Sequence, residues 1–131
     1  MVSIQPELWV EQAGAAVAFY RDAFGARVVH CVGDGGGDNI VAQLAVGEAM
    51  FWVAAASPEA GRLSPKALGG GTGRTLLVVD DPDSVVKSAV DAGAVATSAV
   101  GDEHGWRVGR VVDPFGHEWE VGKPMAGWPP P

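Results

Sequence analysis

The side chains with most chemistry to offer are three histidines, five tryptophans and a set of dispersed carboxylates. His104 and Trp106 lie in a short connection rich in glycine, and Glu120 lies in a run of acidic and aromatic residues near the C-terminus. A carboxylate or an imidazole can act as a general acid or base, and an indole can stack on a flat ligand. Glu120 and His104 are therefore the candidate catalytic residues.

Other reactive arrangements are missing from the sequence. No Ser–His–Asp or Cys–His combination has a recognisable spacing. The glycine-rich stretch from Gly69 to Gly73 lacks the lysine and the following helix that a phosphate-binding loop needs. We therefore interpret that stretch as a flexible lip of a cleft, and the sequence favours a binding site over a familiar catalytic one.

Alternation in the opening strand predicts which side chains face such a cleft. Gln5, Glu7 and Trp9 fall on one face, opposite Ile4, Leu8 and Val10. The three apolar residues are typical of a core, so the other three should line the cleft, with Trp9 as a stacking platform for an aromatic ligand.

Five further residues are predicted to join them, among them His104 near the mouth of the cleft. Trp52 and Trp106 are expected to offer indole surfaces, and Glu120 alternates with Trp119, which we expect in the core. Arg74 either forms an ion pair with Glu120 or Glu7, or anchors an anionic ligand. The expected ligand-binding residues are Gln5, Glu7, Trp9, Trp52, Arg74, His104, Trp106 and Glu120.

An internal repeat supplies the elements that must position these residues. The run from Val10 to Ala26 is matched roughly 70 residues later by the run from Val79 to Ala94, each ending in Asp-Ala followed by Gly-Ala or Phe-Gly-Ala. Apolar spacing predicts the order βαβββ twice, in modules of about 3–56 and 74–123. Residues 57–73 form the connecting loop, residues 33–38 a flexible turn, and residues 124–131 an extended tail.

Size, charge and cysteine content limit the possible functions. A chain of 131 residues is predicted to be a single domain, and its net charge of −7 argues against binding to nucleic acid or to an anionic membrane. The single cysteine, Cys31, cannot form an internal disulfide, and no signal peptide or membrane-spanning stretch is visible. We expect a cytoplasmic protein whose partner is a small molecule.

Together, the doubled βαβββ order, Phe19-Tyr20 before Phe24-Gly25, and Asp113-Pro114-Phe115-Gly116-His117 before the last strand resemble the vicinal oxygen chelate superfamily. This superfamily contains glyoxalase I, bleomycin-resistance proteins and extradiol dioxygenases. The resemblance implies an α+β fold in which two βαβββ modules form a cleft-bearing, partly open barrel-like sheet. It also implies a homodimer, because relatives commonly pair modules across a two-fold axis.

The resemblance further implies four positions for metal ligands, which here hold Gln5, Trp52, Arg74 and Glu120. Indole nitrogen only donates hydrogen bonds and guanidinium is a permanent cation, so neither Trp52 nor Arg74 can be a ligand. Gln5 and Glu120 alone are too few for a zinc-type catalytic centre. We therefore expect no metal and no other cofactor, and a divalent metal on Gln5 and Glu120 is the alternative.

Three hypotheses follow. The first is a metal-independent protein of the bleomycin-resistance type that binds a small, planar aromatic compound such as an antibiotic. The second is an enzyme of the same fold, a lyase, isomerase or oxygenase, that uses Glu120 as a base or a divalent metal. The third is a dimerising module with an empty cleft. The sequence does not identify the ligand.

Overall fold

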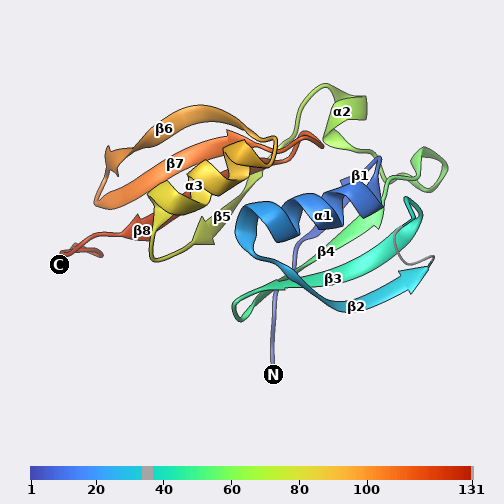
Figure 1. The fold of residues 1–131 in the computed structure, drawn as a ribbon, viewed down its shortest axis with the longest axis horizontal. Helices are drawn as coiled ribbons and strands as arrows, with labels where there is room; N and C mark the ends of the chain where they lie inside the picture. Colours follow the sequence, from blue (N-terminus) through green and yellow to red (C-terminus); the bar gives the residue numbers. More distant parts are fainter. Residues whose placement is uncertain (34–36, 131) are drawn as a thin grey trace.

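The chain folds into two four-stranded sheets, each carrying one helix, and the computed structural model describes residues 1–33 and 37–130 (Figure 1). The first module contains β1 (Glu7–Val10), α1 (Ala13–Phe24), β2 (Arg27–Gly33), β3 (Ile40–Val46) and β4 (Ala49–Ala55). The second contains β5 (Arg74–Val78), α3 (Pro82–Asp91), β6 (Val95–Glu103), β7 (Trp106–Val112) and β8 (Glu118–Pro124). The predicted α+β class and the repeated βαβββ order are thus confirmed.

The two sheets have the same topology. Sheet 1 has the strand order β1-β4-β3-β2 and sheet 2 the order β5-β8-β7-β6. In each sheet the strand before the helix pairs in parallel with the last strand of the module, and the other pairs are antiparallel. Neither sheet closes on itself, which agrees with the predicted partly open architecture.

The helix ends follow from local sequence. Asp81 caps α3 by accepting a hydrogen bond from the amide of Ser84 at 3.2 Å, and Pro82 occupies the first turn, where no amide hydrogen is needed. Helix α1 ends at Gly25, whose φ of 70° is left-handed and costs glycine little.

One core joins the modules on their helix sides. Helices α1 and α3 lie against each other (Figure 1). Trp119, 2% exposed, contacts Phe24 and Phe51 of the first module, with ring centroids 4.8 and 5.5 Å away. The prediction that Trp119 belongs to the core is confirmed. Among the described residues, no helix is long and apolar enough to cross a membrane.

Three segments differ from the sequence prediction. The opening strand begins at Glu7, and Ile4 before it is exposed, because Pro6 has no amide hydrogen with which to extend the pairing. The connection 57–73 contains a short 3-10 helix, η1 (Pro58–Ala60), and one turn of helix, α2 (Pro65–Leu68), capped by Ser64. The tail folds back so that Trp128 contacts Trp106. Of the turn expected over residues 33–38, positions 34–36 lie outside the described residues.

Each sheet has a second face that the core does not cover. Alternation places Val32 and Val41 on the open face of sheet 1, and Leu76 and Val78 on that of sheet 2. All four are at least 40% exposed. These open faces also carry the predicted binding residues.

Candidate functional site

On the open face of sheet 1, polar side chains converge on Gln5. Its Oε1 accepts a hydrogen bond from Trp52 Nε1 at 2.8 Å and another from Gln43 Nε2 at 2.9 Å. Gln43 and Trp52 are cross-strand partners in β3 and β4, so their side chains share a face. The Trp52 amide also donates to the carbonyl of Pro6 at 2.8 Å, which holds the segment before β1 beside β4. The side-chain oxygen of Gln5 therefore already accepts two hydrogen bonds.

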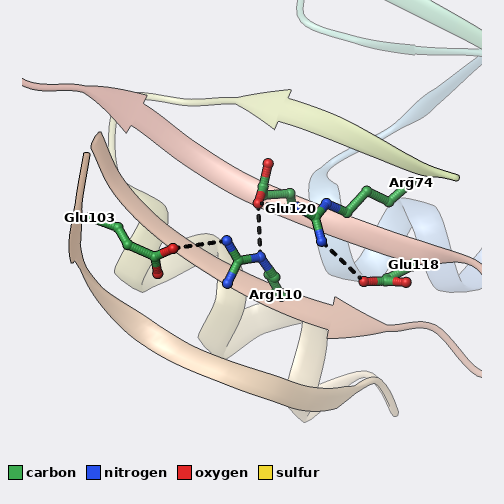
Figure 2. Close-up of polar contacts among 5 residues, drawn as sticks. All are labelled: Arg74, Glu103, Arg110, Glu118 and Glu120. Carbon is green, nitrogen blue, oxygen red and sulfur yellow. Dashed lines mark hydrogen bonds and ion pairs between the residues drawn. The ribbon is translucent and has the colours of Figure 1, made fainter. Parts of the chain in front are cut away.

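The open face of sheet 2 carries a cluster of alternating charges (Figure 2). Arg110 Nε donates to Glu120 Oε2 at 2.8 Å, and its Nη2 donates to Glu103 Oε1 at 3.0 Å. Arg74 Nη2 lies 3.2 Å from the same Glu120 oxygen, and its Nη1 lies 3.5 Å from Glu118 Oε1. The alternative in which Arg74 pairs with Glu120 is thus the one found. Hydrogen bonds, first to Glu103 and then to Glu120, raise the pKa of Arg110.

Part of this cluster borders a cavity of about 310 Å³, which we call the sheet-2 cavity. Its apolar walls are Leu76, Trp106 and Val108. Its polar walls are His104, Glu103, Arg110 and Glu120. Three predicted site residues, His104, Trp106 and Glu120, therefore meet in one cavity.

Backbone geometry explains how Trp106 and His104 reach that cavity. A Cβ on Gly122 would lie 3.2 Å from Val108 Cγ2 and 3.3 Å from Trp106 Cε3, so glycine leaves room for the indole across the strand. His104 has a φ of 50° and Gly105 a φ of 81°, the pattern of a tight turn between β6 and β7. The turn accounts for the conformation of His104 without any catalytic role.

Glu7 and Trp9 do not line the sheet-2 cavity. Trp9 Nε1 is 3.4 Å from Glu7 Oε1, and both line a cavity of about 280 Å³ against the 57–73 connection and His117. His117 Nε2 is 2.9 Å from the carbonyl oxygen of Trp9. The glycine-rich segment predicted as a lip thus borders this separate hollow.

The four positions implied as metal ligands form two groups. Gln5 lies with Trp52, and Arg74 lies with Glu120. Within the described part of the chain no hydrogen bond or ion pair joins one group to the other. Leu76 lies between them, because it lines both the sheet-2 cavity and a cavity of about 540 Å³ that Gln5 also lines.

Sequence reasoning missed Gln43, Glu103, Glu118 and Arg110. Arg110 had a usable signal, because alternation from Trp106 through Val108 places it on the same face. Gln43 had none, because its contact with Gln5 depends on how β3 and β4 pair.

Comparisons with known proteins agree with this fold. The family model described as "Glyoxalase/Bleomycin resistance protein/Dioxygenase superfamily" matches residues 3–121. An uncharacterized protein of Mycobacterium tuberculosis is 34% identical over 127 residues, which cover 94% of this chain and 75% of that protein.

Two solved structures show the same fold. TioX from Micromonospora sp. ML1 is 25% identical with a TM-score of 0.74, covering 95% of this chain and 100% of that one. A mutant of the fosfomycin resistance protein FosX from Listeria monocytogenes, in complex with Mn(II) and a dihydroxypropylphosphonic acid, is 13% identical with a TM-score of 0.71. The match to FosX covers 97% of this chain and 94% of that one.

Proposed function

Because this chain belongs to the glyoxalase/bleomycin resistance protein/dioxygenase superfamily, we propose that it binds a small aromatic molecule on its open sheet faces without a metal ion. One observation carries the proposal: the side chains at the four ligand positions are bonded within the protein, and one of them, Glu120, lines a cavity walled by Trp106 and Leu76. An indole and aliphatic side chains in a concave site favour a flat apolar ligand.

The residues present do not fit a metal ion. Trp52 and Arg74 have no lone pair to offer, and Gln5 Oε1 already accepts two hydrogen bonds. Glu120 contacts two guanidinium groups, so a divalent cation beside it would be repelled by both. Within the described residues, no group of three or more His, Cys, Asp or Glu side chains could hold a metal. No reaction step is therefore assigned to a metal.

Metal analysis tests this part of the proposal. We expect purified protein to carry no stoichiometric zinc, nickel, manganese or iron by elemental analysis. We also expect added metal to leave the melting temperature unchanged, because a tightly bound ion would stabilise the folded state by mass action. About one metal per chain would contradict the proposal and favour an enzyme.

Ligand binding is tested by quenching of tryptophan fluorescence with a panel of flat aromatic compounds, antibiotics among them. Trp52→Ala and Trp106→Ala should each weaken binding about tenfold to a hundredfold, because each removes stacking and buried area. Val90→Ala, an exposed residue of α3 that lines none of the cavities described above, is the control and should bind like the parent. Unchanged binding by both tryptophan variants would overturn the aromatic-site proposal.

An enzyme remains the second candidate, because Glu120 and His104 line the same cavity and could act on one ligand. In that case Glu120→Gln would abolish turnover of a compound that the variant still binds. A binding protein would return every bound compound chemically unaltered.

We also propose that the protein is a cytoplasmic homodimer in which a second copy covers the open faces. The exposed valines and leucine on those faces support the assembly. The single free cysteine supports a reducing location. An antibiotic-resistance role is supported by the family's name and is tested by the same ligand panel.

A further inference from the structure

The charges around the sheet-2 cavity do not cancel. Three carboxylates, of Glu103, Glu118 and Glu120, surround two guanidinium groups, of Arg74 and Arg110. Each guanidinium contacts two of these carboxylates, so neither is left over for an anionic ligand. The cluster therefore keeps one negative charge, in a chain whose net charge is −7.

The surplus charge faces a partly desolvated space. The side chains of Glu120 and Arg110 are 18% and 24% exposed. The contacts of Glu120 use Oε2 and that of Glu103 uses Oε1, which leaves the second oxygen of each carboxylate for a ligand (Figure 2). Charge interactions at such positions are screened less than on an open surface.

The remaining walls of the sheet-2 cavity restrict what kind of cation fits. Trp106 offers an indole, the aromatic ring that attracts cations most strongly through its face. Leu76 and Val108 add apolar surface, which favours burial of the hydrocarbon part of an organic ligand over binding of a small hydrated ion. Carboxylates, an indole and aliphatic side chains around about 310 Å³ match a flat organic cation.

Resting on the proposed function, we propose that the sheet-2 cavity selects a planar aromatic cation over neutral or anionic molecules of the same shape. The ring system lies against Trp106 and the apolar wall, and the positive group faces Glu103 and Glu120. An anion in the same place would meet carboxylates and guanidinium groups that are already paired.

Three tricyclic probes that differ mainly in charge test this selection. Proflavine is a cation at neutral pH, acridine is neutral and anthracenecarboxylate is an anion. Isothermal titration calorimetry at low salt should give proflavine an affinity at least about tenfold above that of acridine. Anthracenecarboxylate should bind most weakly. Trp106→Leu should weaken both proflavine and acridine, and proflavine more, because the cation also loses its attraction to the indole face.

Two variants that each remove one negative charge distinguish the effect of a carboxylate in the cavity from the effect of the protein's overall negative charge. Glu103→Gln should weaken proflavine about tenfold and leave acridine unchanged, since only the charge facing the cation is lost. Glu59→Gln, at an exposed site outside the cavity, should bind all three probes like the parent. Equal losses in both variants would overturn the placement of the cation.

The outcomes also distinguish this inference from the proposed function. Binding of acridine or anthracenecarboxylate as tight as that of proflavine, and dependent on Trp106, overturns the charge preference and leaves the aromatic site standing. Binding of none of the three probes overturns both.

Discussion

Asp113 is a buried carboxylate surrounded by hydrogen-bond donors. It is 4% exposed, and it accepts from Trp119 Nε1 at 3.0 Å and from the amides of Phe115 and His117 at 2.9 and 3.0 Å. The fourth donor is the hydroxyl of Tyr20, which comes from the other module. A buried carboxylate is costly unless its oxygens are bonded, so this residue both shapes its own turn and ties the modules together.

Removing the hydroxyl of Tyr20 tests that tie. Tyr20→Phe keeps the ring among its aromatic neighbours but leaves Asp113 with one donor fewer. We expect a loss of about 1–3 kcal/mol in the free energy of unfolding, measured by urea denaturation, because a buried acceptor loses a partner. Phe19→Leu, which changes packing alone, is the comparison; a Tyr20→Phe protein as stable as the parent would contradict the role given to this bond.

Alkaline pH offers an independent test, because Tyr20 is the only tyrosine. Burial first, and the charge of Asp113 second, raise its pKa well above 10.0. Folding therefore favours the protonated phenol, so its contribution to stability is complete below pH 10.0 and declines as pH rises toward the raised pKa. Tyrosinate absorbance should appear only with unfolding, whereas a midpoint near 10.0 in folded protein would contradict burial of the hydroxyl.

At the scale of the elements, Arg107 fastens helix α3 to strand β7. Its Nε and Nη2 donate to the two oxygens of Asp83 at 2.7 and 2.8 Å, and its Nη1 donates to Asp102 of β6 at 3.0 Å. Asp83 lies in the first turn of α3, where a negative charge also favours the helix. One guanidinium thus joins a helix and two strands of the second module.

Acidification should release this attachment. The hydrogen bonds from Arg107 lower the pKa of Asp83 below its usual 3.8, so the ion pair stabilises the fold above that pH and is lost as pH falls through the lowered value. Asp83→Asn should therefore lower the melting temperature at neutral pH and make no difference in strong acid. Asp22→Asn, on the exposed surface of α1, should lower the melting temperature less at neutral pH; an equal loss there would contradict the attachment.

Element order and core could be predicted from this sequence because they depend on local patterns. Alternation placed Trp119 in the core, and the Asp81-Pro82 start of α3 is visible in the residues themselves. The partner of Arg110 could not be predicted, since its position opposite Glu120 depends on the register of β7 and β8 across the Asp113 turn. Gln5 and Trp52 form a group apart from Arg74 and Glu120 because of how the two modules pack. The spacing of residues along the sequence carries no information about that packing.

For the whole molecule, the open sheet faces predict assembly. Val32 on sheet 1 is 57% exposed, and a second copy covering that face would bury it. Val32→Asp should shift the dimer toward monomer by at least about tenfold in dissociation constant, measured by light scattering over a concentration series. Val90→Asp, on the outer surface of α3, should leave assembly unchanged. A parent protein that is monomeric at micromolar concentration would exclude the homodimer.

The bond between Tyr20 and Asp113 spans 93 residues, whereas each strand pair joins strands of one module. Closing a longer loop costs more entropy, so we expect each module to form its own sheet early and the two to dock late along the folding pathway. Tyr20→Phe should then speed unfolding in stopped-flow measurements and leave the refolding rate nearly unchanged, since the contact is absent from the transition state. The lifetime of the folded protein would accordingly depend on how fast the two modules separate.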